Sequence, residues 1–208
     1  SSAASDVYKR QELCGDRVPF GTDLLFESAG VVVGVELCED LWVPIPPSSY
    51  LVQQGADIIV NLSATNELIG KHSYLLSLVR QQSARCVAGY VYASAGFGES
   101  STDLVFAGNG LVVENGSILA ESKRFSSTPQ LVVSEIDVER LRTERRVMTS
   151  FAKGAWAHGR DARFIPFILN DIPLRLTRKV GAFPFVPSDS LVLNERCAEI
   201  LDIQSSGS

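Results

Sequence analysis

Two apolar runs set the pattern of the first half of the chain. VVVGVELC, residues 31–38, and DIIVNLS, residues 57–63, are each as long as a strand and contain few polar positions. Nearly continuous apolar strands are typical of parallel sheets that are covered on both faces. Between them, PIPPSS predicts a turn with a serine helix cap, and YLVQQGA predicts a short helix that ends at Gly55. The segment therefore predicts one β-α-β unit.

A second unit follows, and then the pattern changes. HSYLLSLVRQQSAR, residues 72–85, has apolar positions at helical spacing, and VAGYVYASAG, residues 87–96, predicts a β-branched and aromatic strand. Between residues 104 and 125, short alternating stretches surround an Asn-Gly pair that predicts a hairpin, and LVVSEID, residues 131–137, predicts one more strand. The sheet is expected to become antiparallel here.

The two ends of the chain are less regular. Residues 1–16 start with small, polar and aperiodic residues and are interpreted as a leader that is disordered or foreign to the domain. Residues 138–148 predict a charged helix, and beyond it the periodicity decays until a final helix at NERCAEILDIQ, residues 194–204. The expected divisions are a main domain at 17–150 and an extended C-terminal arm at 151–208.

Composition narrows the class of protein. The 208 residues are 45% hydrophobic and 21% charged, as in a globular α/β protein, and the net charge of -5 offers no basic face for nucleic acid. The longest apolar stretch is too short for a bilayer and the amino terminus lacks a secretory layout, so we expect a cytoplasmic protein without a membrane partner. The scattered cysteines have no CxxC spacing, which favours free thiols over disulfides or a zinc site at Cys14, Cys38, Cys86 and Cys197.

Cys38 lies where a predicted strand ends and a turn begins. In α/β folds, groups that contact ligands lie beyond the carboxyl ends of the strands, so this position suits a nucleophile. A nucleophilic cysteine needs a lowered pKa or a neighbouring base, whereas Glu39 and Asp40 would raise its pKa if their carboxylates faced the sulfur. The alternative is a buried, inert core cysteine, the commoner fate of this residue type. The residue pattern alone leaves both interpretations open.

A polar loop follows the second strand. NLSATNELIGK, residues 61–71, holds hydroxyl, amide, carboxylate and amine side chains, Thr65 and Lys71 among them. Such a loop can recognise a polar substrate, and the alternative interpretation is helix capping and solvation. His72, at a helix start, and His158, in the irregular tail, are not compelling bases and supply too few ligands for a metal site.

Taken together, the motifs resemble the glutaminase domain of glutamine-dependent NAD+ synthetases, which belongs to the nitrilase (carbon-nitrogen hydrolase) superfamily. CEDLWVP with NLSATNE and YVYASAGFGES is the specific combination, and a late PFVP segment separates this family from plain nitrilases and amidases. The resemblance covers nearly everything from Arg17 to Gly207. Its segments run in family order: VPFGTDLLF, GVELCEDLWVPIPPS, GADIIVNLSATNELIGK, QQSARCVAGYVYASAGFGESSTDLVFAGNG, ENGSILAESKRF, LTRKVGAFPFVP and NERCAEILDIQSSG.

The resemblance implies a nitrilase-like αββα sandwich, incomplete here, with mixed sheets and helices outside. It implies that Cys38 hydrolyses glutamine to glutamate and ammonia through a thioester, with the backbone N–H of Glu39 in the oxyanion site. Thr65 and Lys71 match positions that bind glutamine, and Lys71 stands where a basic residue meets the substrate carboxylate. The ammonia would pass to a synthetase domain that uses ATP and Mg2+ to amidate deamido-NAD+, and no cofactor is expected in this chain itself.

The resemblance also places the family's glutamate base and catalytic lysine upstream of VPFGTDLLF, and we expect neither in this chain. Residues 17–150 are thus interpreted as a partial glutaminase domain, and 151–208 as an arm and linker towards an absent synthetase domain. The isolated chain is expected to be inactive, and the full protein to be a homo-oligomer. Two alternatives remain: a stand-alone nitrilase-type amidase that uses Cys38 on another amide, and a catalytically silent fragment of the nitrilase fold.

Overall fold

The structure is a computed structural model that describes residues 10–158, 162–169, 176–178, 186 and 189–206, with the backbone alone for 155–158. The chain divides into two units, residues 1–174 and 175–208. The first unit contains the sheets and the site described below. The second contains helix α6, Ser190–Ser206. Among the described residues, no helix is both long and apolar enough to cross a membrane.

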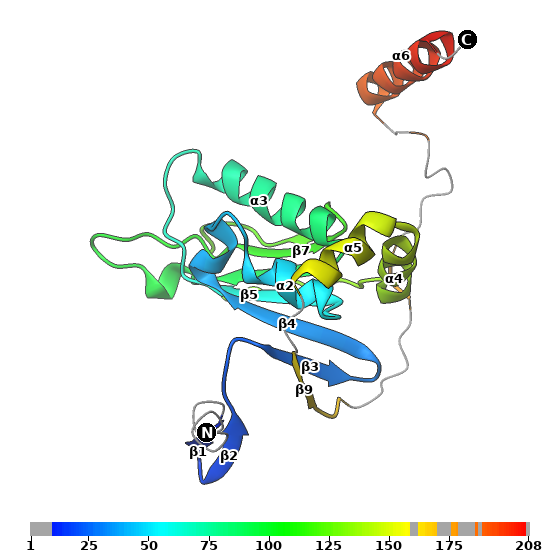
Figure 1. The fold of residues 1–208 in the computed structure, drawn as a ribbon. Coiled ribbons are helices and arrows are strands. Elements are labelled where there is room, and N and C mark those ends of the chain that lie inside the picture. The colour runs from blue at the N-terminus through cyan, green and yellow to red at the C-terminus, as the bar shows by residue number, and fades with distance from the viewer. Residues whose placement is uncertain (1–9, 159–161, 170–175, 179–185, 187–188, 207–208) are drawn as a thin grey trace. The chain divides into compact units, whose positions relative to one another are not determined.

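A seven-stranded mixed sheet forms the centre of the first unit (Figure 1). Its strands are β3 Leu24–Ser28, β4 Val31–Leu37, β5 Ile58–Ser63, β6 Gly89–Ser94, β7 Gly110–Glu114, β8 Ser117–Glu121 and β9 Arg163–Pro166. They lie in the order β8-β7-β6-β5-β4-β3-β9. The parallel pairing of β4, β5 and β6 confirms the two predicted β-α-β units. The antiparallel β7 and β8 confirm the hairpin, in which Asn115 and Gly116 both have positive φ as a type I′ turn requires.

Two helices cover one face of this sheet. They are α2, Pro47–Gln53, and α3, Lys71–Cys86 (Figure 1). Alternate strand positions point towards them and are fully buried, as at Leu25 and Ile59. Gly34 of β4 lies beneath α2, where an added Cβ would come within 2.9 Å of Ile59 Cδ1 and 3.2 Å of Leu51 Cβ. The close approach of α2 to the sheet therefore depends on glycine at this position.

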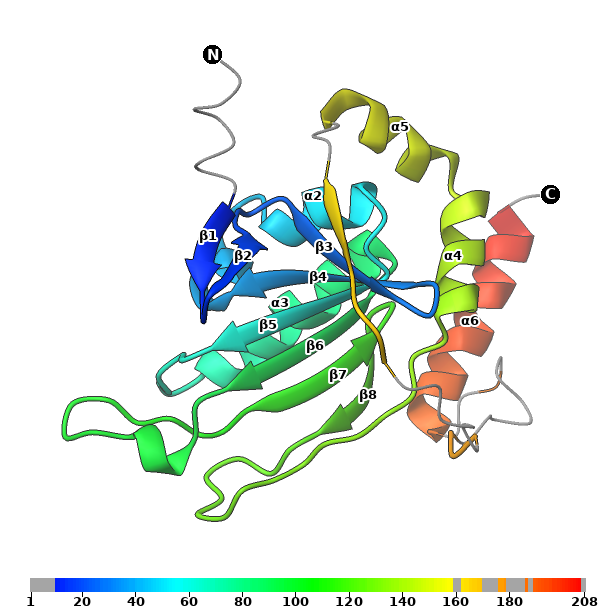
Figure 2. The same ribbon diagram turned by 90° about the horizontal axis from the view of Figure 1, so that it is seen from below.

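The opposite face of the sheet is covered differently. Figure 2 shows this face in front, with α2 and α3 behind the sheet. The segment 129–137 runs over it, with Ile136 packed against Gly89 and Val132 near Gly110. Residues 131–137 form no strand, contrary to the prediction: Val132 and Ile136 pack onto a sheet face instead of joining its edge, and Leu131 and Val133 are exposed. The described residues form one large sheet, not the two of a complete αββα sandwich.

A buried carboxylate fixes helix α4, Val138–Val147, to the sheet. Asp57, whose side chain is 2% exposed, accepts two hydrogen bonds from Arg142, at 2.9 and 2.5 Å, and one from the backbone N–H of Val32 at 3.0 Å. The guanidinium of Arg145 lies 3.7 Å from the same carboxylate. Burial lowers the pKa of Arg145, and the charge of Asp57 opposes this effect. We call these residues the Asp57 clamp.

Towards both ends of the chain the structure has regular elements that the sequence pattern did not predict. Residues 10–19 form a hairpin of two strands, β1 Arg10–Leu13 and β2 Asp16–Pro19. The interpretation of residues 1–16 as a leader that is disordered or foreign to the domain stays a prediction. Residues 1–9 lie outside the described part. In the supposed arm, the structure has helix α5, Thr149–His158, and strand β9, which pairs with β3. The division at residue 150 stays a prediction.

Candidate active site around Cys38

Cys38 is the first residue after β4 and begins a short 3-10 turn, η1, Cys38–Trp42. Its φ of 46° lies in the left-handed region, which is uncommon for a residue other than glycine. Residues held in such conformations cluster at active sites. The side chain is half-buried, so the thiol is not sealed within the apolar core. This placement keeps the nucleophile interpretation open.

Two hydroxyl groups lie on one side of the sulfur, at the end of β5 and in the loop that follows. Thr65 Oγ1 lies 4.0 Å from Cys38 Sγ, and Ser63 Oγ lies 2.8 Å from Thr65 Oγ1. Both residues are brought there because β4 and β5 are parallel and end at the same edge of the sheet, with Leu37 opposite Leu62. The structure therefore brings together the two sequence-predicted residues Cys38 and Thr65.

The pKa of the Cys38 thiol reflects two opposing influences. Burial is the largest, and by itself it raises the pKa. Hydrogen bonds from the backbone of Ala64 and from the hydroxyls of Ser63 and Thr65 lower it, and the backbone of Glu39 adds to them. The hydrogen bonds prevail, so the pKa lies below its ordinary value of 9.0. The thiol is thus biased towards the reactive thiolate.

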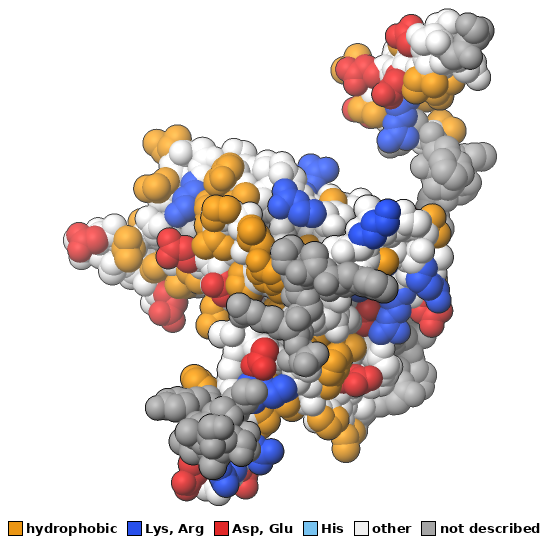
Figure 3. Space-filling model, in the orientation of Figure 1, with side chains coloured by type: hydrophobic (Ala, Val, Ile, Leu, Met, Phe, Trp, Pro, Cys, Tyr) orange, Lys and Arg blue, Asp and Glu red, His pale blue; other side chains and the backbone are white. Residues whose placement is uncertain are grey.

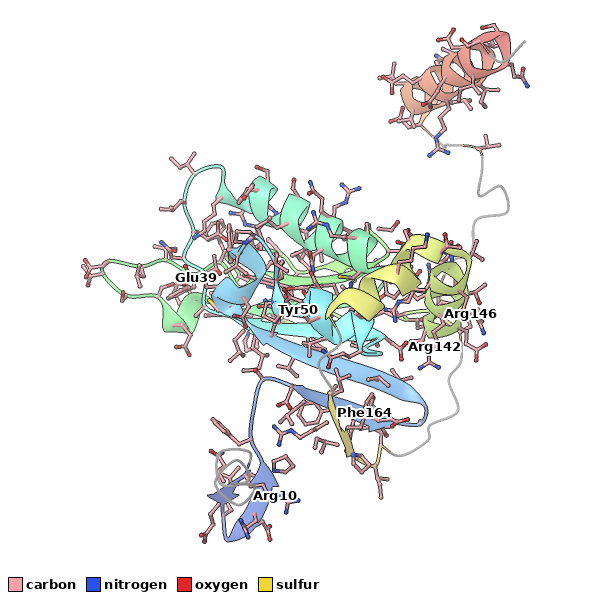
Figure 4. The ribbon with its side chains drawn as sticks, viewed as in Figure 1. Arg10, Glu39, Tyr50, Arg142, Arg146 and Phe164 are labelled. Atoms are coloured by element: carbon pink, nitrogen blue, oxygen red, sulfur yellow. The ribbon has the colours of Figure 1, made fainter. Side chains whose placement is uncertain are left out.

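The two acids after Cys38 do not work against this bias. The carboxylate of Asp40 accepts a hydrogen bond from the backbone N–H of Leu37 at 2.8 Å. Glu39 has an exposed side chain on the turn after β4, labelled in Figure 4, and its backbone faces the sulfur. The carboxylates that seemed unfavourable in the sequence are therefore directed elsewhere. The oxyanion role of the Glu39 N–H remains a prediction.

Lys71 lies beside the same turn. Its Nζ donates to Asn66 Oδ1 at 2.9 Å and stands 5.4 Å from the ring centroid of Trp42, the last residue of η1. The Trp42 ring also contacts Tyr74, with centroids 5.6 Å apart. Lys71 is thus held at the edge of the site by an amide and an aromatic face. Sequence reasoning did not identify Trp42, although its position four residues after Cys38 was available.

The loop that carries Thr65 is tied to the rest of the fold through Glu67. Its carboxylate accepts from Asn109 Nδ2 at 2.6 Å and from Arg124 at 2.9 Å, and its backbone N–H donates to Val105 O at 2.8 Å. These bonds reach segments that are distant in the sequence, with separations of 42 residues to Asn109 and 57 to Arg124. They give the loop a defined conformation in which Thr65 and Lys71 flank η1.

The other candidate residues lie apart from this site. His72 Nε2 is 3.3 Å from a carboxylate oxygen of Glu121 on β8, and the side chain of His158 lies outside the described residues. Cys86 is buried, and burial raises its pKa to about 11. Within the described part of the chain, no group of three His, Cys, Asp or Glu side chains could hold a metal ion.

Two surface features of the first unit bear on where a substrate could bind. A cavity of about 600 Å³ is lined by residues of β6 and β7 and by 126–132, with Tyr92 and Asn109 in its wall. Hydrophobic side chains gather over η1 and the start of α3 (Figure 3), where Val43, Ile45 and Tyr74 are exposed. Cys38 itself does not line the cavity, so the cavity alone does not define the site.

Comparison with known proteins shows the family of the chain. Residues 4–146 match the family model described as carbon-nitrogen hydrolase. The chain belongs to the carbon-nitrogen hydrolase family. This carbon-nitrogen hydrolase chain is 44% identical over 202 residues to the glutamine-dependent NAD(+) synthetase of Mycobacterium tuberculosis, covering 93% of this chain and 30% of that protein. A Saccharomyces cerevisiae protein of the same description is 30% identical, over 83% of this chain and 24% of its own length. The chain thus spans about a third of the relatives' length or less.

Solved structures confirm the nitrilase-superfamily fold. A carbon-nitrogen hydrolase from Helicobacter pylori has 20% sequence identity and a TM-score of 0.54, covering 65% of this chain and 50% of that one. A glutamine-dependent NAD(+) synthetase from Cytophaga hutchinsonii has 25% identity and a TM-score of 0.51, covering 60% of this chain and 19% of that one. The seven-stranded mixed sheet with its helices is therefore part of a nitrilase-like fold.

Proposed function

We propose that this chain carries the nucleophile of a glutamine amidohydrolase that serves NAD+ synthesis. In this proposal, glutamine is hydrolysed to glutamate and ammonia, and the ammonia is used by a synthetase activity that amidates deamido-NAD+ with ATP and Mg2+. The observation that carries the proposal is a half-buried Cys38 with lowered pKa at the carboxyl end of a strand, in a chain 44% identical to glutamine-dependent NAD(+) synthetases.

The proposed chemistry is acyl transfer. The Cys38 thiolate attacks the carboxamide carbon, the C–N bond breaks as the nitrogen takes up a proton, and ammonia leaves a thioester. Water then attacks the thioester carbon, glutamate departs and the sulfur is released. The backbone N–H of Glu39 faces this sulfur and would donate to the oxyanion of each tetrahedral intermediate. The proton carriers would be the glutamate and lysine that the family resemblance implies.

Thr65 and Lys71 are proposed to bind the substrate. Thr65 lies beside the sulfur, and Lys71 stands at the rim, where its ammonium can pair with the α-carboxylate of glutamine. The Trp42 face next to Lys71 would cover the aliphatic part of the substrate. This arrangement distinguishes an amino acid amide from a simple aliphatic amide.

The test is a chimera in which this chain replaces its matching segment of the Mycobacterium tuberculosis enzyme. We expect glutamine-dependent ammonia release, and a loss of at least about a thousandfold in Cys38→Ala. Lys71→Met should raise KM for glutamine about 10- to 100-fold, with Lys71→Arg as the charge-preserving control.

NAD+ formation from added ammonia serves as the folding control, because it does not need Cys38. A chimera that uses ammonia but not glutamine would refute the proposal. Hydrolysis of other amides in preference to glutamine would favour the stand-alone amidase alternative, and no Cys38-dependent turnover of any amide would favour the silent fragment.

A further inference from the structure

A chain of hydroxyl groups joins Cys38 to the buried side of the sheet. Tyr92, on β6, is 1% exposed, and its hydroxyl donates to Ser63 Oγ at 2.9 Å. Ser63 Oγ lies 2.8 Å from Thr65 Oγ1, which lies 4.0 Å from Cys38 Sγ. The four side chains come from β6, the end of β5, the following loop and the residue after β4. They form a continuous path from the core to the sulfur.

The first bond sets the direction of the others. Because the Tyr92 hydrogen points to Ser63 Oγ, the hydrogen of Ser63 is available to point outward, to Thr65 or to the sulfur. Donors that point at a thiolate stabilise it, and hydrogen bonds in a chain polarise one another. The hydroxyls of Ser63 and Thr65 are both among the groups that lower the pKa of Cys38. With Ser63 donating to Thr65 and Thr65 to the sulfur, the positive end of the hydroxyl path lies at the sulfur.

We infer that Tyr92 and Ser63 are positioning residues for the nucleophile, which act together with Thr65 to orient hydroxyl hydrogens towards Cys38 Sγ and favour its thiolate. The inference deepens the proposed function and rests on it for the role of Cys38 as nucleophile. It assigns a task to a buried tyrosine that lies outside the residues expected to touch glutamine.

The charged groups on the surrounding elements are bound elsewhere. Asp40 of η1 accepts from Leu37, and the Glu39 side chain is exposed. In the loop after β5, Glu67 binds Asn109 and Arg124, and Lys71 binds Asn66. The hydroxyl path is accordingly the main side-chain contribution to a lowered thiol pKa on this side of the site.

Tyr90 provides a matched control. It lies two residues before Tyr92 on the same face of β6 and is also 1% exposed. Its hydroxyl donates to the carboxylate of Glu36 and accepts from Asn61 Nδ2 at 3.2 Å, so it belongs to a different network. Either Tyr→Phe substitution removes one buried hydroxyl from β6, and the loss at Tyr90 also takes a donor from the buried Glu36 carboxylate, but only Tyr92 leads to the sulfur.

The test is alkylation of Cys38 by iodoacetamide in the 208-residue chain, followed peptide by peptide with mass spectrometry between pH 6 and 10.5. At pH 7 we expect Ser63→Ala to slow alkylation of Cys38 about three- to tenfold and Tyr92→Phe about twofold. Rates should converge with the unmodified chain at pH 10.5, where the thiol is ionised in every variant. Ser63→Thr should restore the rate, and Tyr90→Phe should leave it unchanged.

Three results would overturn the inference: an unchanged pH profile in Ser63→Ala and Tyr92→Phe, an equal slowing at all pH values, or an equal shift in Tyr90→Phe. Resistance of the buried Cys86 to alkylation shows that each variant is folded in the same samples. If Ser63→Ala makes Cys86 reactive, the pH profile of Tyr92→Phe, which keeps the ring, tests the inference instead. A chimera without glutaminase activity would remove the proposed function but leave this profile intact, so the two failures are distinguishable.

Discussion

Asp57→Asn is expected to destabilise the fold more than any exposed charge substitution. The change removes the negative charge that Arg142 and Arg145 share and weakens the bond to the N–H of Val32. The Arg145 side chain is only 10% exposed, so its guanidinium would stay buried without a counter-charge. Breaking such a pair costs about 3–5 kcal/mol, a large part of the roughly 5–15 kcal/mol that stabilises a typical domain.

The assay is urea and thermal unfolding followed by circular dichroism. For a domain of this size, the expected loss corresponds to a drop of about 6–20 °C in Tm. Asp23→Asn is the matched control, because Asp23 pairs bidentately with Arg163 but is 32% exposed, and it should cost about 0–1 kcal/mol.

The Asp57 clamp and the site are well separated, which sharpens the test. Arg142 of the clamp and Glu39 of the site lie at opposite ends of the sheet (Figure 4). At temperatures where Asp57→Asn is still folded, alkylation of Cys38 should therefore proceed at the unmodified rate. A stability change below about 1 kcal/mol in Asp57→Asn would refute the assignment of a buried, energetically important ion pair.

Three further outcomes are expected. Because the pKa of Cys86 is raised from 9.0 to about 11, the free energy of unfolding should fall by about 2–3 kcal/mol as the pH rises from 9 to 11. Unfolding titrations of the unmodified chain and of Cys86→Ala check this, and identical pH curves would contradict it. Gly34→Ala should cost about 1–3 kcal/mol in denaturant unfolding, because the new Cβ meets Ile59 and Leu51; a neutral result would mean that α2 shifts freely. The free energy of unfolding of Cys38→Gly should exceed that of Cys38→Ala by about 1 kcal/mol, since glycine accepts positive φ without strain. The reverse order would exclude strain at this position.

The elements that were predicted from the sequence are those with local signals. The apolar runs at 31–38 and 57–63 and the Asn-Gly pair carry their information within a few residues, and all became strands or a turn. Strand β9 was missed because its pairing with β3 joins residues about 140 positions apart. Residues 131–137 have the composition of a strand, but glycines on β6 and β7 leave room for them on a sheet face.

The same distinction applies to the site. Cys38 and Thr65 each follow a predicted strand, so their proximity could be anticipated from parallel pairing. Tyr92 could not be placed, because its contact with Ser63 depends on the register of β5 against β6, in which Asn61 lies opposite Tyr92. The pleat then turns the ring towards the helices and its hydroxyl towards the strand ends. The sequence offered only a tyrosine within a predicted buried strand, and its bond to Ser63 became visible in the structure.

The position of Trp42 has a practical consequence. The chain has two tryptophans, and Trp42 contacts both the ammonium of Lys71 and the ring of Tyr74. With Trp156→Phe, the remaining indole would act as a built-in fluorophore whose emission responds when an anion draws the lysine away from its face. Occupancy of the site could then be read optically, in real time and without turnover.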